Sequence, residues 1–411
     1  MFLSRLIAAA ILLLAATPRI AAEGCAIPWD MQSLATPPRV FDDAARSTAA
    51  VKAVFYQSLP WKGRPTRTFA YYGIPPTDGA TTVPAMVLVH GGGGSAFAPW
   101  VELWVGRGYA AIAMDTCGCV SSGGYQHHPR HEHGGPPGWG GFDQIDAPIT
   151  DQWAYHAVAD VILAHSLIRS FPEVDPERTG LTGISWGGYL ACITAAVDHR
   201  FKFAAPVYGC GFLGDNSVWL DDFRTMAPDR ARRWLALWDP SAWLAGTRAP
   251  MLWVSGTTDF AYPMDSLQKS YRLPQSPRTL CLRVDMPHAH GGPGENPEEI
   301  HAMADALLNG GAALPRITRH GRSGPDAWVE FDGPEPVANA ELNWSADTGP
   351  WQQRKWSTLA ADIDPARRRV SARLPETTTV FFFNLLDRRS LVVSSEHEEL
   401  APAPPRAPES H

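Results

Sequence analysis

The sequence predicts an α/β fold with a mostly parallel β-sheet, followed by a small all-β domain. From residue 84 onward, short and fully apolar segments alternate with longer segments of helical periodicity. Strands without polar positions are typical of a parallel sheet whose two faces are both covered by helices. The helical periodicity ends near residue 315, and short β-rich segments separated by turns follow. This second pattern is typical of a β-sandwich.

The individual elements follow from these two patterns. In the first region the expected strands are 85–89, 110–114, 180–182, 203–208, 251–255 and 280–284, and the expected helices are 155–171, 186–199, 263–271 and 297–308. In the second region the expected strands are 328–331, 340–344, 370–374, 379–384 and 391–394.

Two further segments depart from this alternation. Residues 51–74 predict a β-hairpin, because two β-rich segments flank a turn that contains Gly and Pro. Residues 117–150 are rich in Gly, Pro and His and are long for a simple connection. We expect them to form a lid-like loop over an active site.

The ends of the chain predict an exported protein. Arg5, the apolar run 7–16 and the small residues up to position 24 form the pattern of a signal peptide over 1–24. The alternatives are a short buried helix and a retained membrane anchor. We therefore expect a secreted or periplasmic protein with an α/β domain at 25–314 and an all-β domain at 315–400. The Pro-rich residues 401–411 predict a disordered tail.

Composition narrows the class of protein. The 411 residues are 45% apolar and 10% aromatic, so the chain can bury a large core. The net charge is −7 and Lys and Arg do not cluster, so no nucleic-acid partner is expected. After the N-terminus no apolar run reaches the roughly 18–20 residues of a membrane span, so no stable span is expected. The pairing of the six cysteines stays open.

The strongest chemical signal is Gly183-Ile-Ser185-Trp-Gly187, a G-x-S-x-G motif between an expected strand and an expected helix. In this context the serine lies on a tight turn, and side chains at Gly183 and Gly187 would collide with neighbouring backbone. The turn projects Ser185 Oγ out of the sheet, and the helix N-terminus favours developing negative charge. Ser185 is the expected nucleophile.

A glycine-rich loop, His90 to Gly94, follows the strand 85–89. Such a loop supplies one backbone N–H of an oxyanion hole, and the residue after the nucleophile supplies another. The expected donors are Trp186 N–H and the N–H of Gly91 or Gly92. We expect His90 to structure the loop rather than to transfer protons; a loop that is merely flexible is the alternative.

The acid and the base are expected after the next two strands. Asp259 follows strand 251–255 and is the expected acid, ahead of the weaker candidates Asp215 and Asp265. An Asp that only caps the following helix is the alternative. Two histidines compete for the role of base after strand 280–284. We prefer His290, because of its distance from the strand and the glycine directly after it, and keep His288 as the alternative.

A dense histidine cluster lies in the lid-like loop, but its spacing matches no recognisable metal site. Its members are His127, His128, His131 and His133. We expect a solvated loop and no metal. Aromatic residues near this loop are expected either to line a substrate cleft or to pack in the core, and they are Trp139, Phe142, Trp153 and Tyr155.

These motifs resemble the α/β-hydrolase superfamily, and most of all its acetylxylan-esterase and dienelactone-hydrolase branch, which grades into the prolyl-oligopeptidase family. The resemblance covers roughly residues 80–310 and lies in the glycine-rich loop, the serine motif, the Asp259 loop and the His-Ala-His segment. It implies an eight-stranded, mostly parallel sheet, a Ser-Asp-His triad and no cofactor. The His-Ala-His pair departs from the family pattern, which leaves the base open.

The expected function is therefore that of a secreted serine hydrolase that cleaves acyl esters, with acetyl groups on carbohydrate as the expected substrate class. A prolyl-oligopeptidase-like exopeptidase or amidase with the same triad is the alternative. About 60 residues between signal peptide and core are too few for an N-terminal β-propeller, and this weakens the hypothesis of a prolyl-oligopeptidase-like peptidase. A third hypothesis is a carbohydrate- or partner-binding protein with a vestigial hydrolase core.

Overall fold

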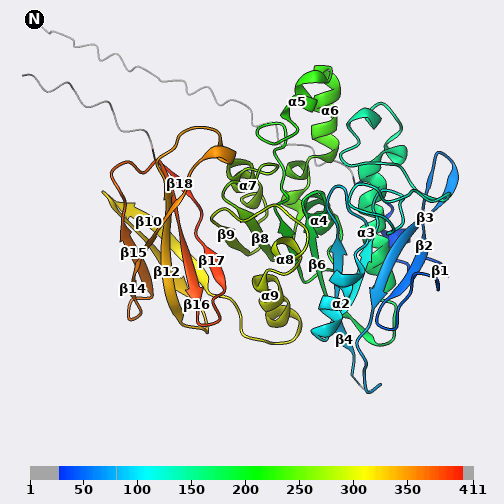
Figure 1. Cartoon of the computed structure of the whole chain (residues 1–411), viewed down its shortest axis with the longest axis horizontal. Coiled ribbons are helices and arrows are strands. Elements are labelled where there is room, and N and C mark those ends of the chain that lie inside the picture. The colour runs from blue at the N-terminus through cyan, green and yellow to red at the C-terminus, as the bar shows by residue number, and fades with distance from the viewer. Residues whose placement is uncertain (1–26, 80, 401–411) are drawn as a thin grey trace, which may run out of the picture.

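The computed structural model describes residues 27–79 and 81–400. The predicted signal peptide 1–24 and tail 401–411 lie outside the described residues. Within them, no helix is long and apolar enough to cross a membrane. Figure 1 shows helices on both faces of a central sheet and a group of antiparallel strands at the end of the molecule opposite the N-terminal hairpin.

The central sheet is parallel in its middle and antiparallel at one side. The strands run in the order β1-β2-β3-β5-β4-β6-β7-β8-β9, and those from β5 to β9 pair in parallel. Their bounds are β1 Val40–Asp42, β2 Lys52–Trp61, β3 Arg64–Gly73, β4 Val83–Val89, β5 Ala110–Met114, β6 Val174–Ile184, β7 Phe203–Val207, β8 Met251–Gly256 and β9 Arg278–Arg283. The predicted hairpin of residues 51–74 is formed by β2 and β3.

Helices bury both faces of this sheet, which explains why its parallel strands carry almost no polar residues. One hydrophobic core lies under α3 and α4, and the other lies under α2 and α9. The helices are α1 Met31–Leu34, α2 Ala98–Gly106, α3 Trp153–Ile168, α4 Trp186–Val197, α5 Leu220–Thr225, α6 Pro228–Trp238, α7 Met264–Tyr271, α8 Gly292–Glu295 and α9 Glu298–Leu308.

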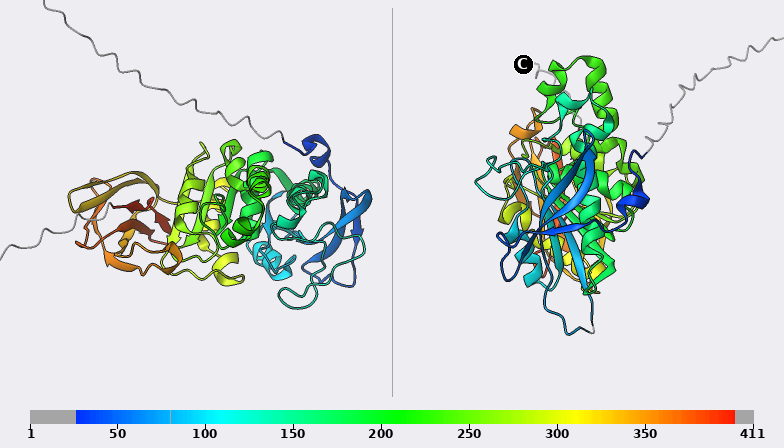
Figure 2. Two further views of the ribbon diagram at one scale, coloured as in Figure 1. Left: turned by 90° about the horizontal axis from the view of Figure 1, so that it is seen from above. Right: turned by 90° about the vertical axis from the view of Figure 1, so that its right-hand side faces the viewer.

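The C-terminal strands form two antiparallel layers that share a third core. One layer is β10-β11-β15-β14, and the other is β17-β16-β12-β13 with β18 on β16. Their bounds are β10 Arg316–Ser323, β11 Asp326–Asp332, β12 Val337–Ser345, β13 Ser357–Ala360, β14 Asp362–Asp364, β15 Arg369–Arg373, β16 Val380–Asp387, β17 Val392–Ser394 and β18 Glu398–Glu399. Figure 2 shows this region as a distinct end of an elongated molecule.

The second of these layers continues the central sheet, which corrects the expectation of eight strands. Ser394 of β17 pairs antiparallel with Leu280 of β9, and the continuous sheet has 14 strands among the described residues. The Ser394 hydroxyl also accepts the Leu282 N–H at 2.7 Å. The contact covers the edge of β9, whose backbone groups would otherwise be unpaired.

Candidate active site

The loops that carry the predicted site residues lie together because they follow neighbouring parallel strands at the same edge of the sheet. Residue Ser185 follows β6, the His90 loop follows β4, Asp259 follows β8 and the two histidines follow β9. Loops after the carboxyl ends of parallel strands are the usual place of ligand sites in open α/β sheets.

Ser185 occupies a strained turn between β6 and α4. Its φ of 56° and ψ of −119° are unusual for a residue with a side chain. The turn can form only because its neighbours are glycines: a Cβ on Gly183 would collide with the Gly187 carbonyl, and a Cβ on Gly187 would collide with the Val89 carbonyl. Residue Ser185 sits at the N-terminus of α4 and lines a cleft. This is the geometry predicted for the nucleophile.

Asp259 pairs with His288. Its Oδ2 lies 2.7 Å from His288 Nδ1, and its Oδ1 accepts the backbone N–H groups of Ala261 at 2.9 Å and Tyr262 at 2.7 Å. The side chain is almost fully buried, with 2% of the residue exposed. These bonds fix the carboxylate, and the carboxylate holds a proton on His288 Nδ1. His288 Nε2 is then free to accept a proton in the cleft that it shares with Ser185.

The predicted pairing of His290 with Asp259 is wrong. His290 Nε2 accepts the Gly91 N–H at 3.3 Å, and His290 Nδ1 lies 3.8 Å from Glu295 Oε1. The prediction rested on the distance of His290 from a strand expected to end at residue 284 and on the glycine directly after it. Instead β9 ends at Arg283 and Asp285 adopts a φ of 51°, so the chain turns early and His288 already lies at Asp259.

Tyr208 supports the segment between the two histidines. Its hydroxyl donates to the Ala289 carbonyl and accepts the Ala289 N–H at 3.3 Å. Its ring stacks on the His288 ring with centroids 4.2 Å apart and planes 29° apart. Tyr208 follows β7 directly and is buried. No local sequence signal marks it, because its role depends on a contact with a loop about 80 residues away.

The predicted oxyanion loop lies beside the nucleophile. A Cβ on Gly91 would lie 3.0 Å from Ser185 Cβ, and a Cβ on Gly92 would lie 2.8 Å from Trp186 Cδ1. Trp186 is the first residue of α4, so its N–H has no partner within the helix. Because Gly91 donates to His290, Gly92 and Trp186 are the two candidates that remain for oxyanion donors.

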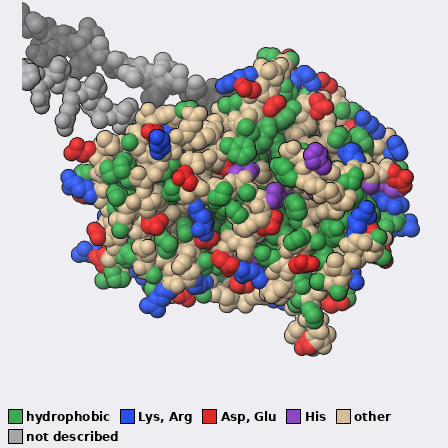
Figure 3. Space-filling model, viewed as in Figure 1, with side chains coloured by type: hydrophobic (Ala, Val, Ile, Leu, Met, Phe, Trp, Pro, Cys, Tyr) green, Lys and Arg blue, Asp and Glu red, His purple; other side chains and the backbone are tan. Residues whose placement is uncertain are grey.

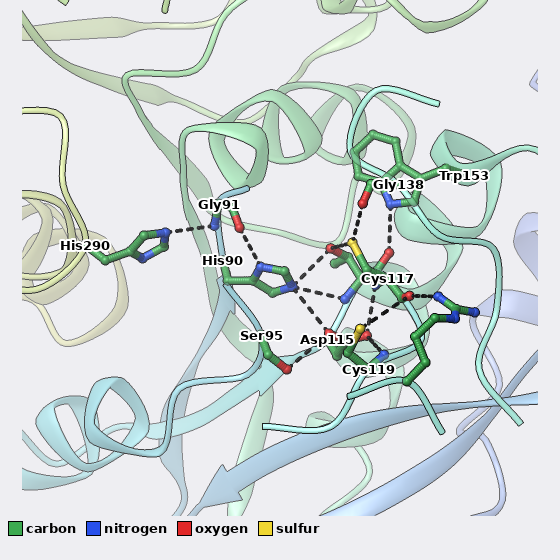
Figure 4. A network of polar contacts seen from close by, with 11 residues as sticks. His90, Gly91, Ser95, Asp115, Cys117, Cys119, Gly138, Trp153 and His290 are labelled. Atoms are coloured by element: carbon green, nitrogen blue, oxygen red, sulfur yellow. Dashed lines mark hydrogen bonds and ion pairs between the residues drawn. The ribbon is translucent and has the colours of Figure 1, made fainter. Parts of the chain in front are cut away.

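His90 structures the loop, as expected. Its Nδ1 donates to the Gly91 carbonyl at 2.8 Å, and its Nε2 accepts the Thr116 N–H at 3.1 Å. Burial lowers the pKa of His90 to about 3, which keeps the ring neutral. Figure 4 shows this network, which continues through Asp115 to Ser95 and Cys117. Burial also raises the pKa of Asp115 to about 6, although three backbone N–H groups and the Ser95 hydroxyl oppose this.

The cleft at Ser185 has a volume of about 580 Å³ and aromatic walls. Tyr125 and Phe260 stand at its rim with 62% and 55% of their surface exposed. The lining residues are Gly92, Gly93, Tyr125, Gln126, Trp139, Ser185, Trp186, Trp219, Phe260, Ala261, His288, Ala289 and His290, and none of these described residues is Asp, Glu, Lys or Arg. Figure 3 shows histidine and hydrophobic side chains gathered on the face of the molecule viewed in Figure 1.

The lid-like loop reaches this cleft. Gln126 N–H donates to the Gly93 carbonyl at 2.8 Å, and Trp139 lines the wall. Of the other aromatics, Trp153 and Tyr155 belong to the core and Phe142 packs against it. Among the described residues no group of three or more His, Cys, Asp or Glu could hold a metal ion. The five described cysteines are free thiols.

The chain is similar to two families of hydrolases. The acetyl xylan esterase (AXE1) family matches residues 42–224, and the prolyl oligopeptidase family matches residues 146–308. The uncharacterized peptidase YuxL of Bacillus subtilis (strain 168) is 23% identical over 207 residues. That alignment covers 47% of this chain but 28% of YuxL, so the chain spans little more than a quarter of that relative.

Two solved structures share the fold at low sequence identity. The acetyl xylan esterase from Paenibacillus sp. R4 has a TM-score of 0.55 at 22% identity, covering 68% of this chain and 92% of its own. Acetyl xylan esterase 1 from Thermoanaerobacterium sp. JW/SL YS485 has a TM-score of 0.52 at 18% identity, covering 68% of this chain and 93% of its own.

Proposed function

We propose that this chain, which is an α/β-hydrolase of the branch that holds the acetyl xylan esterases and the prolyl oligopeptidase family, hydrolyses acyl esters with Ser185, His288 and Asp259. The observation that carries the proposal is the Asp259–His288 hydrogen bond of 2.7 Å in the loop beside a strained, cleft-lining serine.

Each side chain has a defined part in this reaction. His288 Nε2 takes the proton of Ser185 as Oγ attacks the acyl carbon, and it then protonates the leaving alcohol. Asp259 holds the tautomer and stabilises the imidazolium. The N–H groups of Gly92 and Trp186 stabilise the oxyanion. Water then hydrolyses the acyl-enzyme by the same route.

The lining of the cleft favours an uncharged substrate. An exopeptidase that recognises a free chain terminus has to bind an ammonium or a carboxylate, and a fixed opposite charge serves this purpose best. No Asp, Glu, Lys or Arg is among the described residues that line the cleft. The exposed faces of Tyr125 and Phe260 suit the apolar face of a sugar ring, so acetyl esters of carbohydrates are the proposed substrate class.

An exopeptidase or amidase is the second candidate, and the match of residues 146–308 to the prolyl oligopeptidase family favours it. The same triad serves both reactions. An amide differs because its amine is a poor leaving group and depends more strongly on protonation by the histidine. Turnover of an aminoacyl anilide that exceeds turnover of the aryl acetate would favour this candidate.

The test combines turnover with labelling. The purified protein should hydrolyse an aryl acetate, release acetate from acetylated xylan, and lose both activities on reaction with a serine-directed phosphonate. Mass spectrometry should find the label on Ser185, and Ser185→Ala should be inactive and unlabelled. No turnover and no label in the parent would refute the proposal, and carbohydrate binding by such an inactive protein would instead support a vestigial hydrolase core.

We also propose export, from the signal-peptide pattern over residues 1–24. Expression of the full chain in a Gram-negative host, followed by fractionation and N-terminal sequencing, tests this. A processed chain outside the cytoplasm is expected, and an unprocessed cytoplasmic chain would contradict it.

A further inference from the structure

His290 has no role in the triad, yet it lies at the nucleophile. Its Nε2 accepts the Gly91 N–H at 3.3 Å, and a Cβ on Gly91 would lie 2.9 Å from that nitrogen and 3.0 Å from Ser185 Cβ. The ring lines the same cleft as Ser185 and packs on Phe97 with centroids 5.0 Å apart. A nitrogen that accepts this backbone N–H cannot at the same time take the serine proton.

Two histidines from distant parts of the chain thus hold consecutive peptide units of the oxyanion loop. His290 binds the N–H of the unit that joins residues 90 and 91. His90 Nδ1 binds the Gly91 carbonyl at 2.8 Å, and Gly94 N–H binds the same carbonyl at 3.2 Å. That carbonyl and the Gly92 N–H belong to one planar trans unit and point in opposite directions. Fixing the carbonyl therefore aims the Gly92 N–H. Figure 4 shows the contacts of His90 and His290 with Gly91.

The surroundings of His290 favour the tautomer that this contact needs. Glu295 Oε1 lies 3.8 Å from Nδ1, on the side of the ring away from Gly91. Burial alone would raise the pKa of Glu295, but the His290 ring and the backbone at Gly291 hold it below its ordinary value. The carboxylate therefore favours a proton on Nδ1, which leaves the Nε2 lone pair for Gly91 N–H.

We propose that His290 is a positioning residue: together with His90 it clamps the Gly91 peptide units, so that the Gly92 N–H points at the oxyanion site. The inference rests on the proposed hydrolase function. His290 contacts neither the acyl carbon nor the Ser185 proton in this role. It acts through the backbone, and it does so only while Nε2 is unprotonated.

Among the described residues, three histidine or acidic side chains lie around His290. They are Glu295 from α8, His90 from the loop after β4, and His288 from its own loop. His90 stays neutral through the working range because burial lowers its pKa to about 3. His90 therefore keeps donating from Nδ1 to the Gly91 carbonyl.

Two variants of similar size separate the clamp from other roles. His290→Gln keeps an oxygen that can accept the Gly91 N–H but does not titrate, and His290→Leu keeps only the bulk. We expect His290→Leu to lower kcat for an aryl acetate by about 10–100-fold, because a misdirected donor loses part of the roughly 10²–10³-fold effect of an oxyanion-hole donor. KM should change less than about threefold. The affinity for a trifluoromethyl ketone, which forms a charged tetrahedral adduct, should fall in parallel with kcat/KM.

His290→Gln should recover most of the loss, because its amide oxygen can accept the Gly91 N–H as His290 Nε2 does. Equal losses in the Gln and Leu variants would overturn the clamp, because the imidazole itself would then be required. A kcat within threefold of the parent in the Leu variant would overturn it as well.

A measurement that needs no activity separates this inference from the proposed function. Amide hydrogen exchange of the segment 90–94 should speed up at least tenfold in His290→Leu and stay near the parent in His290→Gln. A parent without turnover but with this exchange pattern would refute the hydrolase proposal and keep the clamp. Unchanged exchange in a correctly folded Leu variant, as judged by its melting temperature, would refute the clamp.

Discussion

His288 and His290 are two residues apart, yet their rings serve different partners: His288 Nδ1 lies 2.7 Å from Asp259 Oδ2, whereas His290 Nε2 accepts the Gly91 N–H at 3.3 Å. One histidine is tied to the acid after β8 and the other to the loop after β4. Between them, the N–H and the carbonyl of Ala289 both hydrogen-bond to the Tyr208 hydroxyl.

The first prediction concerns the base. His288→Ala should lower kcat for an aryl acetate by about 10³-fold or more, as loss of a triad member does. His290→Ala should cost far less, because it removes support for the oxyanion loop and not the proton acceptor. Steady-state kinetics of both variants measure the order, and a larger loss in His290→Ala would refute the assignment.

Asp259→Asn should lower kcat by about 10³–10⁴-fold with little change in KM. The amide oxygen can still accept the N–H groups of Ala261 and Tyr262, but the amide no longer holds the proton on His288 Nδ1. Asp265→Asn is the matched control, because the Asp265 carboxylate accepts the Asn216 amide at 3.0 Å. A kcat near the parent value in Asp259→Asn, or an equal loss in the control, would contradict the role of Asp259.

Tyr208→Phe should lower kcat about tenfold, because the loop that carries His288 loses both hydrogen bonds to Ala289. It should also cost about 1–2 kcal/mol of unfolding free energy. Tyr109→Phe is a suitable control: its hydroxyl donates to Asp305 at 2.5 Å on α9. The control should lose similar stability in urea unfolding and keep its kcat. Equal kcat values in the two variants would argue against Tyr208 as support for the site.

Tyr125→Ala and Phe260→Ala should each raise KM for an acetylated xylo-oligosaccharide about 2–10-fold, which corresponds to one stacked aromatic contact of roughly 0.5–1.5 kcal/mol. Turnover of the bound ester should stay unchanged in Tyr125→Ala, whereas Phe260→Ala should also lower kcat, because the Phe260 ring packs on the His288 ring with centroids 4.7 Å apart. Leu359→Ala controls for general surface effects, because Leu359 is an apolar residue on β13 with 42% of its surface exposed. An unchanged KM in both rim variants would remove the argument for sugar stacking.

Acid should destabilise the fold. Burial lowers the pKa of His90 and His397 to about 3 and that of His165 to about 4. Between pH 6.5 and these values the unfolded chain binds protons that the folded protein excludes. Stability therefore falls as the pH drops through this window, by up to roughly 1.4 kcal/mol per histidine and pH unit. Burial raises the pKa of Asp115 to about 6 and that of Asp160 to about 7, and these two groups offset part of the loss.

Urea unfolding between pH 7 and pH 4 measures this slope. His165→Asn should be less stable than the parent at pH 7, because it loses the bond of His165 Nδ1 to Asp198 Oδ2 at 2.8 Å. Its stability should nevertheless fall less steeply with acid. Stability that is constant or rises toward pH 4.5 in the parent would show that these histidines do not govern acid unfolding.

Local patterns predicted most of the central sheet and the nucleophile. The apolar strand 110–114 coincides with β5, and the serine motif stands at the turn between β6 and α4. Both depend on interactions within a few residues: burial of a strand on two faces, and sterics that only Gly183 and Gly187 tolerate. The exposed strand β10 was missed, because its residues carry little apolar pattern. The 14-stranded sheet was missed because β17 meets β9 across more than 100 residues of sequence.

The sequence by itself determined the candidate nucleophile, the candidate acid and a choice between two histidines, since strand ends, turn glycines and chain order are local properties. Only the tertiary structure decided between His288 and His290. The positive φ of Asp285 turns the chain early, Tyr208 holds Ala289, and Gly91 engages the second ring. The direction of a ring in such a loop depends on contacts with residues that follow β4, β7 and β8. The spacing of residues along the chain does not reveal these contacts.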